Sequence, residues 1–268
     1  MQREQAGALV EQYGRSASVD DKPAYFRLHR RRYLALLEAL EAPPGSRVLE
    51  IGCNPGQFTE ILVRAGYRVW GLDLRPEDRA SLWERLGVEV RRGNLETEPL
   101  PYAENSFEAV VLSEVVEHLA ASPLPALQEV HRVLLPGGHL ILSTPNACSL
   151  RERLLLAGRL LSFRSLEPAE AFHRRMRLRG EERYTMHQRL YTAGELRWLL
   201  REAGFERVRV AYVAAREGVG VTWRRVLFQP WRGVPKALLW GLALLLPPLR
   251  STLLAVARKG DATRCAPA

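Results

Sequence analysis

The stretch that decides the fold is Val48-Leu49-Glu50-Ile51-Gly52-Cys53-Asn54-Pro55-Gly56. Its mainly apolar start is typical of a buried strand, and helical periodicity begins at Gln57, so the two glycines fall in a turn from strand to helix. Open α/β sheets bind ligands at this edge, beyond the carboxyl ends of their strands. A dinucleotide fingerprint would need glycine at positions 54 and 57. The chain has Asn54 and Gln57 there, which makes a pyrophosphate ligand a weak interpretation.

Short apolar runs alternate with helical segments along most of the chain. The predicted strands are Val48–Ile51, Val69–Leu72, Val88–Val90, Ala109–Leu112, Leu140–Leu142, Val208–Val213 and Leu253–Ala257. The predicted helices are Tyr25–Leu40, Gln57–Ala65, Pro76–Leu86, Leu124–Leu135, Leu154–Leu161 and Thr192–Ala203. Four leucines of the first helix recur at helical spacing and are expected on one buried side: Leu28, Leu36, Leu37 and Leu40. The alternation predicts an α/β fold with a doubly wound, mostly parallel sheet.

Composition narrows the classes of protein. The chain has 268 residues, 47% of them hydrophobic and 26% charged, which excludes a disordered or fibrous protein. Its net charge of +9 is uneven, with −5 over residues 43–150 and +13 over residues 151–268. The basic half is expected to attract anionic surfaces or substrates. Three distant cysteines, Cys53, Cys148 and Cys265, form no disulfide framework and no zinc spacing, and no metal site is expected. With no apolar leader at the N-terminus, a cytoplasmic protein is expected.

Polar residues follow the next two predicted strands. Asp73 comes 21 residues after Gly52, where an acidic side chain can accept the hydroxyls of a ribose. Gly93-Asn94-Leu95 follows the third strand, where a short amide can reach an adenine edge. The pattern therefore indicates an adenosine ligand without a diphosphate.

Five motifs in this order resemble the successive motifs of the class I S-adenosylmethionine-dependent methyltransferases. They are Glu50–Gly56, Gly71–Asp73, Gly93–Leu95, Glu114–Leu119 and Leu135–Leu140, and the run His187–Phe205 is similar to the segment before the sixth strand of the same family. The most similar branch acts on small molecules or glycans, as ubiquinone-type O-methyltransferases do. The resemblance implies methyl transfer to an oxygen, with nitrogen as the alternative. The resemblance implies a Rossmann-like sheet of seven mostly parallel strands, a helical N-terminal cap, a helical insertion after the fifth strand, and S-adenosylmethionine as the methyl donor.

The resemblance also implies roles for individual residues. Glu50 and the loop from Gly52 through Cys53 and Asn54 to Gly56 would hold the methionine part of the cofactor. Asp73, followed by Leu74, would bind the ribose, Asn94 and Leu95 would flank the adenine, and Ser113 and Glu114 would lie beneath the sulfonium. Asn54 replaces a usual glycine, which we attribute to the ease with which Asn adopts a left-handed conformation. Asn94 replaces a commoner aspartate.

The same reading divides the chain into parts of one methyltransferase domain. We expect a helical cap at 1–42, a cofactor-binding core at 43–148, a basic insertion or lid at 149–191, the C-terminal part of the sheet at 192–259 and a tail at 260–268. The cap and the lid are expected to cover the cofactor and shape the acceptor pocket. Tyr13 and Arg30 of the cap are candidates to reach the cofactor carboxylate.

Methyl transfer to a hydroxyl benefits from a general base, and histidine is suited to that role because its pKa lies near neutrality. His118, just after the fourth strand, and His187 in the lid are the catalytic candidates, with His173 as a further one. His118 is as readily interpreted as a structural histidine at the edge of the core. Four lid arginines are either a solvated face or a means of steering an anionic acceptor: Arg174, Arg175, Arg177 and Arg179.

The apolar run Ala237–Leu249 is too short to span a bilayer. It is interpreted as a helix that covers the sheet between the last two strands. The alternative is peripheral membrane contact through 235–249, with basic residues flanking the run that include Arg224, Arg225, Arg232 and Lys236. Such contact would bring the protein close to a lipid-linked acceptor.

Two other functions compete with small-molecule methylation. The basic C-terminal half leaves an RNA-modifying methyltransferase open. However, the Asp/Asn-Pro-Pro-aromatic tetrapeptide of base N-methylating enzymes is replaced by Ser113-Glu114-Val115-Val116, so nucleic acid is an unlikely partner. A non-catalytic cofactor-binding scaffold is the third reading, because of the asparagines at 54 and 94.

Overall fold

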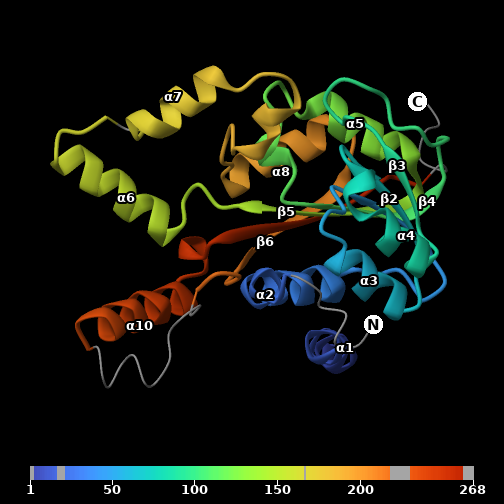
Figure 1. Cartoon of the computed structure of the whole chain (residues 1–268), viewed down its shortest axis with the longest axis horizontal. Helices are drawn as coiled ribbons and strands as arrows, with labels where there is room; N and C mark the ends of the chain where they lie inside the picture. The colour runs from blue at the N-terminus through green and yellow to red at the C-terminus, as the bar shows by residue number, and fades with distance from the viewer. Residues whose placement is uncertain (1–2, 17–21, 166, 218–229, 262–268) are drawn as a thin grey trace, which may run out of the picture.

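A computed structural model describes residues 3–16, 22–165, 167–217 and 230–261. Its centre is a seven-stranded sheet in the order β3-β2-β1-β4-β5-β7-β6 (Figure 1). The strands are β1 Arg47–Ile51, β2 Arg68–Asp73, β3 Glu89–Arg92, β4 Phe107–Ser113, β5 Leu134–Pro145, β6 Glu206–Val213 and β7 Thr252–Arg258. The first five pair in parallel, and β7 lies antiparallel between β5 and β6. The predicted strands and the mostly parallel seven-stranded sheet are confirmed.

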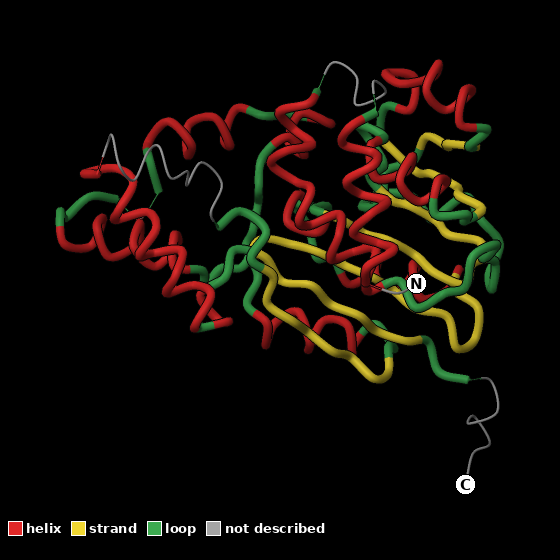
Figure 2. Tube along the Cα trace, turned by 90° about the horizontal axis from the view of Figure 1, so that it is seen from below, coloured by secondary structure: helices red, strands yellow, loops and turns green. Residues whose placement is uncertain are grey.

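Helices cover both faces of this sheet (Figure 2). The α-helices, with the labels of Figure 1, are α1 Arg3–Arg15, α2 Pro23–Ala39, α3 Gln57–Arg64, α4 Ala80–Leu86, α5 Leu124–Val133, α6 Leu150–Leu161, α7 Ala169–Arg177, α8 Ala193–Glu202 and α10 Pro230–Leu245. The short 3-10 turns are η2 Pro76–Arg79, η3 Val116–His118, η4 Gly180–Thr185 and η5 Pro247–Leu249. Thr192 and Glu195 form a capping box at the start of α8.

The core has two layers because strand side chains alternate between the faces of the sheet. On β4, Ala109 and Val111 pack in the layer that contains α1, α2 and α3, whereas Val110 and Leu112 pack in the layer of α5 and α8. All four side chains are buried. This two-sided burial explains why the strands read as continuous apolar runs.

On α2, the prediction that Leu28 is buried is wrong. Leu36 and Leu37 are buried, but Leu28 is 36% exposed and His29 takes the core-facing position. His29 precedes Leu36 by seven residues, or about two turns, and so shares its side of the helix, whereas residue 28 is rotated by about 100°.

The interpretation of Ala237–Leu249 as a helix covering the sheet is also wrong. The run does form most of α10, but α10 extends beyond the end of the sheet, at the same end of the molecule as α6 (Figures 1 and 2). Leu238 and Leu245 are 69% and 80% exposed, and Ala243 is the buried contact. Arg224 and Arg225, which were expected to flank the run, fall outside the described residues.

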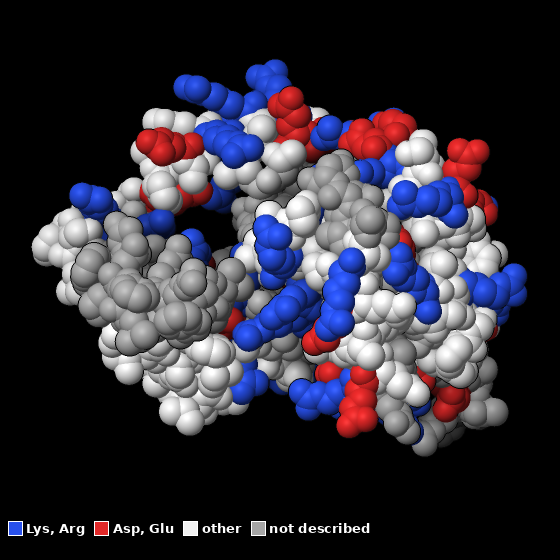
Figure 3. Space-filling model, turned by 60° about the horizontal axis from the view of Figure 1, so that its bottom comes forward, with Lys and Arg blue, Asp and Glu red and all other residues white. Residues whose placement is uncertain are grey.

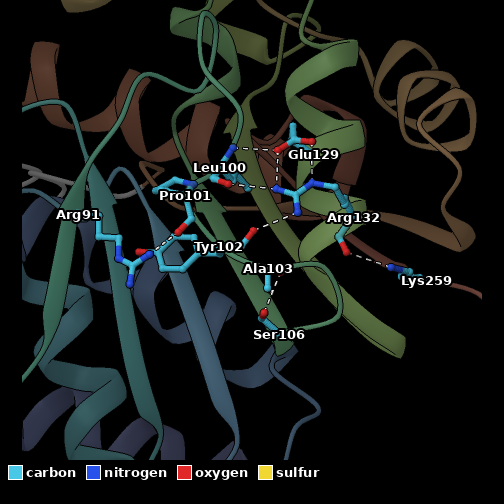
Figure 4. Close-up of polar contacts among 9 residues, drawn as sticks. All are labelled: Arg91, Leu100, Pro101, Tyr102, Ala103, Ser106, Glu129, Arg132 and Lys259. Carbon is cyan, nitrogen blue, oxygen red and sulfur yellow. Dashed lines mark hydrogen bonds and ion pairs between the residues drawn. The ribbon is translucent and has the colours of Figure 1, made fainter.

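A polar network braces the edge of the sheet where β4 begins (Figure 4). Arg132, at the end of α5, donates to the carbonyl oxygens of Leu100 and Tyr102, at 3.0 Å each. Glu129 accepts from the Leu100 amide at 2.8 Å, and Lys259 donates to the Arg132 carbonyl at 3.2 Å. These bonds hold the loop before β4 against α5, at the edge opposite the carboxyl ends of the parallel strands.

Candidate functional site

A cavity of about 160 Å³ lies at the carboxyl ends of the parallel strands. Residues after β1, β2, β3 and β4 line it, together with Tyr184 from η4. Six predicted cofactor residues are among them: Gly52, Asp73, Leu74, Asn94, Leu95 and Glu114. His118 lines the same cavity.

The glycine loop after β1 has the backbone that the sequence predicted. Gly52 and Gly56 have φ angles of +75° and +92°, which side chains of L-residues rarely adopt. A Cβ on Gly56 would lie 2.2 Å from Leu82 of α4, so glycine is also required sterically. Cys53 does not line the cavity, because its side chain is buried against Leu82 and Trp83. Burial raises the pKa of its thiol.

Asp73 accepts three hydrogen bonds at 3.0 Å each. Asn54 donates from its amide to Oδ2 and from its side chain to Oδ1, and the Arg75 amide donates to Oδ1. A carboxylate offers about four acceptor positions, so about one remains. Asn54 is not in the left-handed conformation, so our explanation for it is wrong: it is a hydrogen-bonding partner of Asp73.

Glu50 is a buried acid beneath the loop. It is 4% exposed, and Oε2 accepts a 2.6 Å hydrogen bond from Thr59. Burial raises the pKa of this carboxyl to about 8, and the Asp73 carboxylate acts in the same direction. Glu50 supports the loop from below and does not line the cavity.

Asn94 links the core to the segment predicted as a lid. Its Oδ1 accepts from the Glu96 amide at 3.0 Å, and its Nδ2 donates to the Tyr184 hydroxyl at 3.2 Å. Leu95 is 9% exposed and forms an apolar wall. Tyr184 was missed by the sequence analysis, because nothing in the chain signals which residue of 149–191 returns to the sheet edge.

Glu114 lines the cavity and forms ion pairs with two arginines. It follows β4 with a φ of +56°, a strained conformation for a residue other than glycine. Its Oε2 lies 3.2 Å from Arg32 of α2 and 3.5 Å from Arg216, and both Arg32 and Glu114 are largely buried. Ser113 contacts Ser143 at 3.0 Å between the hydroxyl oxygens and does not line the cavity. Arg32 was missed, whereas Arg30 is exposed.

His118 and His187 meet at the mouth of the cavity. Their ring centroids lie 4.8 Å apart at 81°, and Nδ1 of His118 lies 3.1 Å from the Met186 carbonyl oxygen. Burial lowers the pKa of both rings. The structure therefore brings the two predicted catalytic histidines together. His173 lies on α7, exposed and against Phe172.

Glu117 lies directly behind the two histidines and is fully buried. Its Oε2 accepts from the Thr144 hydroxyl at 3.0 Å, while Oε1 has no hydrogen-bond partner among the described residues. Burial raises the pKa of this carboxyl to about 8. The run Glu114-Val-Val-Glu117-His118 was the available signal, since it places two acids and a histidine at one strand end.

A second, larger cavity of about 470 Å³ lies between α6 and α10. Its walls are mainly apolar, and it also reaches His187 and Arg216. The apolar residues that line it include Leu150, Leu154, Leu155, Leu239, Trp240 and Ala243. None of the four arginines at 174, 175, 177 and 179 lines either cavity.

The residues at the smaller cavity fit an S-adenosyl cofactor. Asp73 keeps an acceptor position for a ribose hydroxyl, Leu74 and Leu95 offer apolar contact to a base, and Glu114 lies at the inner end. Together with the strand order, these residues define a class I S-adenosylmethionine-dependent methyltransferase.

Comparison with known proteins gives the same class and identifies the family. A family model described as a methyltransferase domain matches residues 25–210, more than half of the chain. This protein therefore belongs to that methyltransferase family.

Relatives are similar over part of the chain. A probable S-adenosylmethionine-dependent methyltransferase of Mycolicibacterium smegmatis is 37% identical over 123 residues, 46% of each chain. A ubiquinone biosynthesis O-methyltransferase of Ruegeria pomeroyi is 33% identical over 168 residues, 61% of each chain. The chain spans about half the length of the curated relatives it matches.

Solved structures share the fold. A possible histamine N-methyltransferase of Thermotoga maritima superposes with a TM-score of 0.54 at 21% identity, covering 90% of this chain and 96% of that one. A putative methyltransferase of Haloferax volcanii, in complex with the activator Trm112, gives 0.61 at 16% identity and covers 97% of both. At these identities the likeness establishes the fold alone.

Proposed function

We propose that this enzyme transfers the methyl group of S-adenosylmethionine to a hydroxyl oxygen of a small molecule that carries an apolar portion. The observation that carries this proposal is that the two cavities adjoin at a pair of histidines. His118 lines the smaller one, His187 lines the larger one, and the two rings are in contact. An acceptor with its hydroxyl at the histidines would extend its apolar portion between α6 and α10.

The larger cavity has the chemistry of a binding site for such an acceptor. Its volume of about 470 Å³ falls within the range of small-molecule sites, which are mostly apolar with a few polar groups. Trp240 contributes one such group, because its buried Nε1 has no hydrogen-bond partner within the described part of the chain. Arg151, Arg216 and Lys236 share this lining with Glu152 and Glu217, so the cavity does not select strongly for the charge of the acceptor.

The cofactor supplies an electrophilic methyl group on a sulfonium, so the chain's own task is alignment and exclusion of water. Asp73 and Leu95 would hold the adenosine, as the sequence motifs imply. The ion pair between Arg32 and Glu114 would fix the inner end of the site. We propose that His118 and His187 receive the acceptor hydroxyl and orient its oxygen toward the methyl group.

Two observations support oxygen as the methylated atom. Histidine side chains at the junction offer acceptors to a hydroxyl hydrogen. Several relatives are named ubiquinone biosynthesis O-methyltransferases, including that of Ruegeria pomeroyi.

We further propose that the ends of α6 and α10 contact a membrane surface from which the acceptor enters. No helix in the described ranges is long and apolar enough to cross a bilayer. Both helices nevertheless expose leucines, with Leu161 at 81% and Leu245 at 80%. Arg153 and Lys236 lie on the same two helices, and basic residues beside exposed apolar ones favour anionic lipid surfaces.

The test is methyl transfer from labelled S-adenosylmethionine to phenols and catechols that share a head group and differ in alkyl chain length. We expect KM to fall as the chain lengthens, by up to about fourfold per buried methylene. Leu239→Asp, inside the larger cavity, should raise KM for the long-chain acceptor and leave that for the short one unchanged. Leu238→Asp is the matched control, because Leu238 is exposed and does not line the cavity.

Either of two results would overturn this proposal. One is a KM that does not depend on chain length in the wild-type enzyme. The other is a screen in which only RNA or another nucleic acid accepts the methyl group.

A further inference from the structure

Three metal-ligating side chains converge between the two cavities: Glu117, His118 and His187. The first two are neighbours in η3, directly after β4, and His187 comes from the segment between η4 and α8. One ligand atom from each residue can be chosen so that all three lie within 4.8 Å of one another. Three donors from two distant parts of the chain thus face one point.

Glu117 is the independent observation that indicates a ligand. Its side chain is fully buried, and only Oε2 is satisfied, by Thr144 at 3.0 Å. Oε1 has no hydrogen-bond partner within the residues described. A buried carboxylate oxygen without a partner is costly, and a cation is one of the groups that can compensate it.

The ring of His118 is already oriented as a ligand. Its Nδ1 lies 3.1 Å from the Met186 carbonyl oxygen, which makes Nδ1 the protonated nitrogen and leaves the lone pair on Nε2. Metal-bound histidines commonly donate their second nitrogen to a carbonyl or carboxylate in this way.

The spacing is close to that of a bound ion. Ligand atoms at about 2.1 Å from a tetrahedral ion lie about 3.4 Å apart. The present limit of 4.8 Å therefore requires movements of about 1 Å, which rotation of the exposed His187 side chain can supply. Two imidazoles and one carboxylate suit first-row transition ions such as Zn²⁺, and they leave a coordination position open.

Neighbouring charges must also be compatible with a cation. Arg32 and Arg216 face the site, but Glu114 pairs with both, at 3.2 Å and 3.5 Å. Glu152 adds negative charge near His187. The two arginines are thus largely offset by acids outside the three ligands.

We propose that Glu117, His118 and His187 form a binding site for a divalent transition-metal ion, whose open position would take the acceptor's hydroxyl oxygen. The ion-binding half stands on the geometry alone, while the role of the open position rests on the proposed function. With the ion bound, the ion takes the place of the two free imidazoles in receiving the acceptor hydroxyl. Coordination would hold the oxygen in line with the methyl group and make its hydroxyl more acidic, with the proton released to solvent.

The test is titration of the EDTA-treated and dialysed full chain with Co²⁺ alone, followed by visible absorption, and with Zn²⁺, followed by calorimetry. We expect one ion per chain and the intense visible bands of four- or five-coordinate Co²⁺. His187→Gln and Glu117→Gln should each weaken binding by more than the 10- to 100-fold typical of losing an outer-shell partner. His173→Gln is the matched control, because that exposed histidine lies outside the cluster.

Glu117 is buried, so its variant is checked by thermal unfolding, and the exposed His187 provides the variant that keeps the fold. Absence of Co²⁺ bands in the wild-type protein would overturn the proposal, as would equal Zn²⁺ affinity of wild type and His187→Gln. Both readouts need no acceptor. Methyl transfer by an EDTA-treated enzyme would contradict the proposed role of the ion in the reaction. It would not contradict the proposed methyl transfer to a hydroxyl oxygen.

Discussion

Asp73, the residue proposed to bind the ribose, is expected to affect the strength of cofactor binding. Three donors already occupy its carboxylate, two of them from Asn54. A ribose offers two hydroxyls, but about one acceptor position remains. If Asp73 binds the ribose as proposed, the Asn54 side chain competes with it for Oδ1.

Replacing Asn54 with alanine tests this competition. Asn54→Ala removes the side-chain donor while keeping the backbone donor, and Asn54 lies outside the left-handed region, so alanine is tolerated. We expect S-adenosylhomocysteine to bind about fivefold more tightly, the effect of one hydrogen bond of about 1 kcal/mol. Isothermal titration calorimetry measures the change. Unchanged or weaker binding would mean that the Asn54 side chain supports Asp73 without competing.

The sequence predicted site residues that lie at the ends of the strands, but it did not predict those that reach the site from distant parts of the chain. Residues in the turn after a strand, such as Gly52, Asp73 and Asn94, lie where the strand pattern places them. Arg32 and Tyr184 reach the site from α2 and η4, which tertiary packing alone brings to the sheet edge. The hydrogen bonds from Asn54 to Asp73 were not predicted, because the conformation of Asn54 was considered without its neighbours.

Helix α2 covers one face of the sheet and also contributes a side chain to the site. Its inner side carries His29 and Arg32, each 6% exposed, and Arg32 reaches Glu114. Burial lowers the pKa of His29 to about 3, and the positive charges of Arg32 and Arg216 act in the same direction. His29 is thus neutral in the fold and gains a proton more readily in the unfolded chain.

This shift predicts a loss of stability in acid. Below the unfolded pKa of about 6.5 the unfolded state binds the proton and the folded state does not, so stability falls as the pH drops from 6.5 toward 3. At pH 5 the loss from His29 alone is about 2 kcal/mol relative to pH 8. Urea unfolding of wild type and His29→Leu at both pH values measures the free energy of unfolding. The decrease in this free energy from pH 8 to pH 5 should be about 2 kcal/mol smaller in the variant than in wild type. The same pH difference in both proteins would contradict the assignment.

The elements differ in how well the sequence predicted them. Strands buried on both faces stand out as apolar runs, and α8 carries its own capping signal. Helices α1 and α7 lie in the segments expected to be helical, but their bounds were not predicted, because polar residues are frequent in both. The apolar run in α10 was read as a covering helix on the assumption that apolar residues face the core, whereas much of it faces outward.

Over the whole molecule, charge and apolar surface are unevenly distributed. The net +13 of residues 151–268 includes α6 and α7, which extend beyond the sheet on the same side as α10 (Figure 1). Figure 3 shows Lys and Arg side chains around a hollow on one face of the molecule. Exposed leucines beside this positive charge are the basis of the proposed membrane contact.

Vesicle binding tests the contact directly. Wild type should sediment with vesicles containing anionic phosphatidylglycerol more than with neutral phosphatidylcholine vesicles, and less so in high salt. Leu161→Asp combined with Leu245→Asp should abolish sedimentation. Trp198→Asp is the control, since Trp198 is 60% exposed on α8. Equal sedimentation of the double variant and the control would contradict the proposed membrane contact.

We propose that the cavity beside Asp73 binds the cofactor. The thermal midpoint of unfolding, measured with and without S-adenosylhomocysteine, tests this binding. At about 100 times the dissociation constant, binding adds about 2.7 kcal/mol, or roughly 5–10 °C for a chain of this size. We expect that shift for wild type and its loss in Asp73→Ala, whose midpoint without ligand reports on the fold. A wild-type protein that shows no shift, or an Asp73→Ala variant that shifts equally, would contradict this proposal.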